Sequence, residues 1–145
     1  MTRRPISEGL LDGIDDEPTL IGSRCADCRI VTFPRQGSCP RCASIAMDDH
    51  QLARRGTLWA WTTQDFAPPS PPYAGPIGKD FVPFAVGYVD LGGEVKVEGR
   101  LTVSDPAAIA HGMAMDLVVV PFGIDDDGTE VVTFAFAPSR DGAEV

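Results

Sequence analysis

Over its C-terminal two thirds, the chain alternates apolar and polar residues with the period of two that is typical of β-strands. The cleanest alternation follows Gly92-Gly93, a pair that predicts a hairpin turn. Residues 57–63 alternate as well, and this pattern predicts both tryptophans, Trp59 and Trp61, on one face of a strand. We therefore expect five β segments, at residues 57–63, 81–91, 94–103, 115–122 and 131–136.

Between the third and fourth of these segments, residues 104–111 read as one short helix. Ser104 or Asp105 would cap it, and Pro106 would occupy its first position. Five strands with a short helix in this place have the element order of a Greek-key barrel of the OB-fold type. Closure would also remove two exposed sheet edges, whereas an immunoglobulin-like sandwich needs about seven strands.

The N-terminal third lacks this alternation. Residues 1–18 are polar around a short apolar patch at 9–11, which is too short for a stable helix and could dock on a neighbouring element. Residues 29–33 are rich in β-formers and predict a strand ending before Pro34. Residues 44–55 resemble a connector. The expected division is an N-terminal arm (1–17), a cysteine-bearing module with connector (18–55), the barrel (56–138) and a C-terminal tail (139–145).

All four cysteines lie in this module as two CxxC pairs separated by ten residues. Each pair can present two thiolates from a tight turn, and together they fit a tetrahedral zinc with Zn–S bonds of about 2.3 Å. Such a site has no open coordination position, so its expected role is to stabilise the fold and not to catalyse a reaction. The expected ligands of this structural zinc are Cys25, Cys28, Cys39 and Cys42.

Other uses of the cysteines remain open. Iron also accepts four thiolates. Two disulfides would need an oxidising compartment, and the N-terminus has no apolar core typical of a signal peptide. A redox CxxC would need only one pair. Four nearby arginines either offset the −2 charge of a zinc–tetrathiolate site or are simply solvated: Arg24, Arg29, Arg35 and Arg41.

The charge distribution narrows the choice of partner. The chain carries a net charge of −9. Residues 57–145 account for it, with four Lys or Arg against thirteen Asp or Glu. A protein that binds the phosphate backbone of nucleic acid is expected to have the opposite sign. No apolar run approaches the 18 residues of a membrane span, so a cytoplasmic protein is expected. His50 and His111 are expected at the surface or in caps, and residues 125–128 in a solvated turn.

The ordered set of motifs resembles the DUF35 family, also called zinc-ribbon/OB-fold acyl-CoA-associated proteins. The family usually has Gly after each cysteine pair, where this chain has Arg29 and Ala43. A non-glycine residue at φ > 0 costs on the order of 1 kcal/mol, so one or both knuckles are expected to be slightly opened. The resemblance spans residues 18–138 and rests on 20–28, 33–35, 39–42, 56–58, 84–91, 98–101, 105–106, 112–113 and 134–138.

The resemblance implies a mainly β protein, with a rubredoxin-like zinc ribbon followed by a five-stranded OB-fold barrel. It also implies a non-catalytic accessory subunit of a thiolase-fold enzyme: a thiolase, an acyltransferase or a sterol-carrier-type aldolase. The partner would supply the catalytic residues in a heterotetramer or larger complex. This chain would help form the site for the acyl-CoA, a CoA ester of lipid or steroid metabolism, and no catalytic residue carries over to it.

Within this interpretation, a Pro-rich loop at residues 67–79 is the candidate partner or acyl-CoA surface. It carries Tyr73 as an aromatic anchor and Lys79 as a cation for CoA phosphates, with Trp59 and Trp61 beside it. The loop could instead be a stiff spacer, and the tryptophans could belong to the core. The alternative function is a zinc-ribbon/OB-fold module whose tryptophans stack on bases, which the acidic barrel disfavours.

Overall fold

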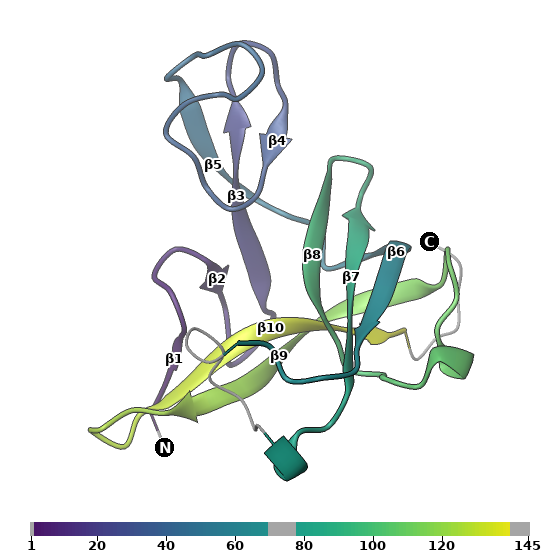
Figure 1. Ribbon diagram of the computed structural model, residues 1–145. Helices are drawn as coiled ribbons and strands as arrows, with labels where there is room; N and C mark the ends of the chain where they lie inside the picture. Colours follow the sequence, from purple (N-terminus) through teal and green to yellow (C-terminus); the bar gives the residue numbers. More distant parts are fainter. Residues whose placement is uncertain (1, 70–77, 140–145) are drawn as a thin grey trace.

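The computed structural model describes residues 2–69 and 78–139. Within them the fold is mainly β, as predicted, with a ribbon module above a barrel (Figure 1). The barrel strands match the five expected segments to within a few residues: β6 (Arg55–Gln64), β7 (Phe84–Leu91), β8 (Val95–Leu101), β9 (Ala114–Ile124) and β10 (Glu130–Pro138).

The five strands close in the order β6-β7-β8-β10-β9 and back to β6. Neighbouring strands are antiparallel except β8 and β10, which run parallel and meet at Leu101 and Phe136. This is the connectivity of a five-stranded OB-fold barrel, so the predicted fold is confirmed. The β7–β8 hairpin turns at Gly92 and Gly93 with φ of +64° and +75°, values that glycine adopts without strain.

The barrel interior is filled by the inward residues of each strand. Leu58, Val89, Met115 and Phe136 are fully buried, and they belong to one continuous cluster of buried side chains. Gly99 lies where a Cβ would come within 3.0 Å of the Phe136 ring, so the ring fills the space that the missing side chain leaves. Burying a large apolar side chain contributes about 1.5–3 kcal/mol, which makes this cluster the main source of barrel stability.

The two tryptophans do not share a face, and this prediction is wrong. Leu58 pairs with Val89 and Ala60 with Tyr88, so Trp59 is the extra residue of a β-bulge in β6. A bulge shifts the alternation by one position. Trp59 therefore points out of the barrel, whereas Trp61 is half-buried and packs against the core.

The predicted helix at residues 104–111 is reduced to a single 3₁₀ turn, Pro106–Ala108. Asp105 caps it as expected, because its Oδ1 accepts the N–H of Ala107 at 3.0 Å. The helix ends early because Ile109 adopts an extended backbone (φ −114°, ψ 130°) and is buried in the core. A segment this short gains little from helix formation alone, so packing decides its conformation.

The N-terminal module is a small sheet of β2 (Leu11–Asp12), β3 (Thr19–Cys25), β4 (Val31–Thr32) and β5 (Met47–Gln51). β4 confirms the strand predicted between the cysteine pairs. The expected connector instead contains β5, which pairs with β3 from Ile21 to Cys25. The N-terminal arm is also part of the fold, because Leu11 joins the core and β1 (Arg3–Pro5) pairs with β10.

The ribbon module packs directly on the barrel. The rings of Phe33 and Phe134 meet edge to face with their centroids 5.8 Å apart. His50 of β5 lies 3.1 Å from Glu94 in the β7–β8 hairpin. In the described part of the chain, no helix is long and apolar enough to cross a membrane.

Candidate metal centre and barrel cleft

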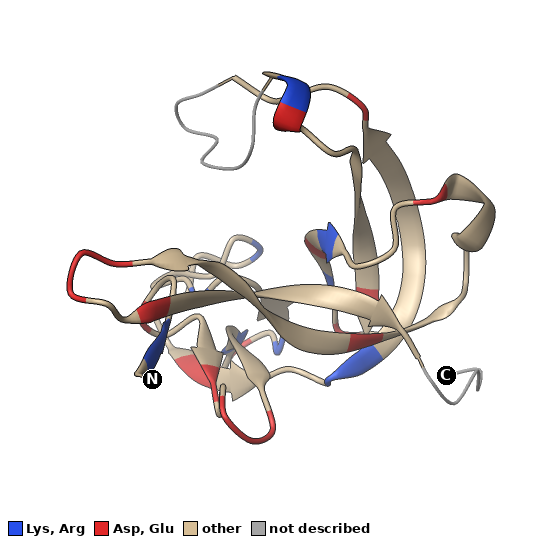
Figure 2. Cartoon of the chain, turned by 90° about the horizontal axis from the view of Figure 1, so that it is seen from below, with Lys and Arg blue, Asp and Glu red and all other residues tan. Residues whose placement is uncertain are grey.

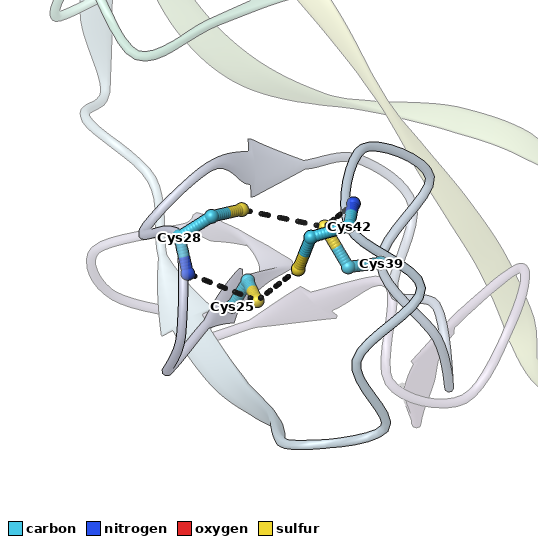
Figure 3. Close-up of side chains that lie close together, drawn as sticks. All are labelled: Cys25, Cys28, Cys39 and Cys42. Atoms are coloured by element: carbon cyan, nitrogen blue, oxygen red, sulfur yellow. Dashed lines mark hydrogen bonds between the residues drawn. The ribbon is translucent and has the colours of Figure 1, made fainter.

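The two CxxC turns bring the four sulfur atoms together (Figure 3). Cys25 Sγ lies 3.6 Å from Cys42 Sγ, and Cys28 Sγ lies 3.5 Å from Cys39 Sγ. All four sulfurs lie within 4.8 Å of one another, and none is in a disulfide. A tetrahedron with Zn–S bonds of about 2.3 Å has sulfurs about 3.8 Å apart, so the donor set and its spacing fit a tetrathiolate zinc.

Both knuckles keep their turns although neither has glycine. Among the described residues, Arg29 and Ala43 are the non-glycine residues with positive φ, at 68° and 64°. Their N–H groups donate to the carbonyl oxygens of Cys25 and Cys39, each at 2.9 Å. The expected opening of the knuckles is therefore not seen. Arg29 and Ala43 therefore hold a left-handed backbone conformation at a cost on the order of 1 kcal/mol each.

Backbone N–H groups favour the thiolate forms of Cys25 and Cys39. The N–H of Cys28 donates to Cys25 Sγ at 3.4 Å and is the main cause that lowers the pKa of Cys25 to about 6. Burial raises the pKa of Cys39, but the N–H groups of Cys42 and Arg41, each 3.4 Å from its Sγ, make the net change a decrease. The thiolate is the form that binds metal, so these turns favour metal binding.

Cys42 is the exposed member of the four. The backbone N–H of Ser44 lowers the pKa of Cys42, but hydrogen bonds with the neighbouring thiols, Cys25 first, raise it to about 12. A bound dication would favour the thiolate at all four positions. Of the nearby arginines, Arg35 pairs with Asp49 at 3.1 Å, and all four are exposed to solvent.

The outer face of the barrel carries an aromatic cluster that the bulge creates. Trp59 is 51% exposed and meets Tyr88 edge to face at 6.2 Å. Lys96 Nζ lies 5.0 Å from the centre of the Trp59 ring, within cation–π range. The carboxylate of Glu98 raises the pKa of Tyr88 through its charge and a hydrogen bond. Trp61 and Tyr88 also line a mostly apolar hollow of about 240 Å³.

A larger cleft of about 390 Å³ opens on the barrel between β8, β9 and the segment that leads into β7. Arg100 lines this cleft, and its guanidinium carbon lies 3.8 Å from the centre of the Phe84 ring. Thr102 and Ser104 add hydroxyl groups, and Val82 and Pro121 add apolar walls. Sequence reasoning missed this cleft because its lining comes from segments far apart in the chain. The only local signal is Arg100 at an outward position of β8.

Lys79 lies in a 3₁₀ turn, Gly78–Asp80, and is exposed. Three residues further on, Val82 joins the wall of the cleft, so both belong to the same stem of the Pro-rich loop. Tyr73 lies outside the described residues. The turn predicted at residues 125–128 is present, with Gly128 at φ +86°.

The four-cysteine ribbon and the closed five-stranded barrel together define a zinc-ribbon/OB-fold protein. Sequence models of the ChsH2 family describe the same two parts: a rubredoxin-like zinc ribbon domain matches residues 14–48, and the C-terminal OB-fold domain matches residues 49–120. The chain belongs to the DUF35 family of ChsH2-like proteins.

Relatives with established names match most of the chain. A DUF35 domain-containing scaffold protein of Methanocaldococcus jannaschii is 25% identical over 130 residues, which cover 86% of this chain and 85% of the relative. The benzoylsuccinyl-CoA thiolase subunit BbsA of Thauera aromatica is 26% identical over 119 residues, covering 82% and 76%. A chain in the solved Ltp2-ChsH2(DUF35) aldolase shares the fold, with a TM-score of 0.58, 24% identity and coverage of 83% and 84%.

Proposed function

We propose that the protein is a non-catalytic accessory subunit that docks on a thiolase-fold enzyme and helps form its acyl-CoA site. One observation carries this conclusion: the likeness to relatives named as a scaffold protein and as a thiolase subunit covers 86% and 82% of this chain. These matches extend over both the ribbon and the barrel. We therefore expect the ribbon and the barrel to act together as an accessory subunit.

The cysteines have a structural role in this proposal. Cys25, Cys28, Cys39 and Cys42 bind one zinc and close its coordination sphere, so the metal offers no open position to a substrate. The zinc holds the two knuckles together and with them β3 and β5, which carry the ribbon onto the barrel.

The barrel cleft supports a role in acyl-CoA binding. It combines apolar walls with one guanidinium, and Lys79 stands on the adjacent loop stem. A CoA ester needs both features, because its acyl chain is largely apolar while its phosphates need cations. The proposed CoA contacts are Arg100 and Lys79. The proposed partner contacts are the exposed bulge residue Trp59, the half-buried Trp61 of the same strand, and Tyr73 on the Pro-rich loop.

Affinity purification of the tagged full-length chain from its native cells tests the proposal. A thiolase-fold subunit should co-purify in a defined stoichiometry, identified by mass spectrometry and reproduced by mixing the two purified proteins. Failure of every thiolase-fold protein of the same cells to bind the chain would contradict it.

Binding measurements on the same two purified proteins can distinguish the proposed partner surface from the proposed CoA surface. Tyr73→Ala should weaken complex formation by about 1–3 kcal/mol if it is an anchor. Lys79→Ala and Arg100→Ala should weaken CoA-ester affinity instead and leave assembly intact. Arg24→Ala, which removes an exposed cation from the ribbon, is the matched control for charge. If the loop and cleft variants all behave like this control, the functional surface lies elsewhere.

A further inference from the structure

The second half of β9 and the first half of β10 leave the barrel as a projecting hairpin, the β9–β10 arm, defined as residues 118–132. β6 pairs with β9 only from Ala114 to Asp116, whereas β10 pairs with β9 as far as Ile124. Figure 2 shows this hairpin extending away from the closed part of the barrel, with its acidic tip at the far end. The arm therefore contributes little to barrel closure.

The N-terminal segment holds the arm in place. β1 adds a parallel strand beside it, from Arg3 opposite Glu130 to Pro5 opposite Val132. Arg3 also bonds to Glu130 at 3.1 Å, and Arg4 forms an ion pair with Asp125 at the tip. A two-stranded hairpin is only marginally stable in water, so this third strand gives the arm a fixed shape.

This fixed arm presents apolar side chains to solvent. Phe122 is 54% exposed and Ile124 is 69% exposed. Val131 pairs with Gly123 and Val132 with Pro121, so Phe122 is the extra residue of a bulge and is turned out of the regular alternation. Ordered, adjacent and exposed large apolar side chains are typical of a protein–protein contact.

The free edge of the arm is poorly suited to strand addition. In the part of the chain that the structure describes, no strand pairs with the edge of β9 beyond Asp116 that faces away from β10. That edge contains Pro121, which has no N–H to donate to an added strand. The exposed Phe122 and Ile124 are therefore the candidate contact residues of the arm.

The charge of the tip defines the complementary surface. Asp125, Asp126 and Asp127 lie together at the turn, and within the described residues only Asp125 is paired with an arginine. A partner that accepts the arm must place cations around its apolar groove, because acidic groups there would repel the tip.

We propose that the β9–β10 arm inserts Phe122 and Ile124 into an apolar groove of the thiolase-fold subunit, and that lysine or arginine residues rim this groove and face the acidic tip. This inference rests on the proposed function, since it names the docking element of the same complex. It assigns a role to a segment outside the zinc site and the aromatic cluster around Trp59. The base of the arm, at Val120 and Pro121, borders the cleft around Arg100, whereas Phe122 and Ile124 do not line it.

The test uses the full-length chain and the purified thiolase-fold subunit obtained in the pull-down, with affinity measured by isothermal titration calorimetry. The double variant Phe122→Ser/Ile124→Ser should weaken binding at least about tenfold, as expected for two exposed anchor residues. Asp126→Lys reverses one tip charge and leaves the turn hydrogen bonds of Asp125 and Asp127 in place. It should weaken binding several-fold at low salt and much less at high salt.

Ile45→Ser is the matched control, because Ile45 is 85% exposed on the ribbon, away from the arm. Unchanged circular dichroism and melting temperature should show that each variant folds. If the wild-type pair forms and the arm variants bind as tightly as Ile45→Ser, the arm is not the docking element, while the proposed function stands. If the wild-type pair does not form, the proposed function and this inference both fail.

Discussion

The ribbon and the barrel reach a stable fold by different means. The barrel surrounds large buried side chains such as Phe136 and Met115 with a closed ring of strands. The ribbon buries few apolar residues, among them Leu20 and Val31, and polar contacts such as the hydrogen bonds between Ser23 and Gln36 join its loops to the sheet. The four sulfurs bring its two knuckles together. A module with so small a core is expected to need a bound metal, so we expect the stability of the ribbon to depend on zinc.

Loss of the metal is the change that should affect the stability of the two modules most differently. Cys39→Ser or zinc removal by chelation should unfold the ribbon and leave the barrel at least partly folded, because structural zinc contributes roughly 10–16 kcal/mol of apparent binding energy in small peptides. Hydrogen exchange would show loss of protection in β3–β5 and retention in β6–β10. Ser38→Ala, an exposed neighbour of the ligand, is the control.

Metal analysis of the purified protein checks the premise of this prediction. One zinc per chain is expected. Less than half an equivalent of zinc, with no iron in its place, would remove the proposed difference between the two modules.

The second prediction perturbs the barrel alone. Phe136→Ala should lower the free energy of unfolding by about 3–5 kcal/mol, because it leaves a cavity in the barrel core. Zinc content should not change in the fraction that remains folded. Ile124→Ala, which truncates an exposed side chain, should change stability by less than about 0.5 kcal/mol. Loss of zinc in proportion to barrel destabilisation would mean that the two modules fold as one unit.

The third prediction concerns the strain within a knuckle. Ala43→Gly should stabilise the metal-bound ribbon by about 0.5–1 kcal/mol, because relief of the left-handed conformation outweighs the entropy that glycine adds to the unfolded chain. Ala26→Gly, in the other turn but without positive φ, should destabilise it slightly. Chelator titration followed by circular dichroism measures both, and equal effects of the two substitutions would argue against strain at Ala43.

The sequence predicted the barrel well because its strands obey a strict alternation that local side chains determine. It failed where one extra residue breaks the alternation: nothing local distinguishes the bulge at Trp59 from a regular strand. β5 was missed because its sequence, Met-Asp-Asp-His-Gln, is polar, and only pairing with β3 makes it a strand. The four cysteines could be assigned to one site from spacing alone. The cleft around Arg100 could not, since its walls come together only in the closed barrel.

We propose that this chain supports catalysis by a thiolase-fold partner and does not itself catalyse. The most direct measurement compares acyl-CoA turnover by the purified chain, by the purified partner and by the reconstituted pair. We predict no turnover by the chain alone and a large gain when the chain is added to its partner. Robust thiolysis, aldol cleavage or acyl transfer by the chain alone would contradict this claim, and so would full activity of the partner without it.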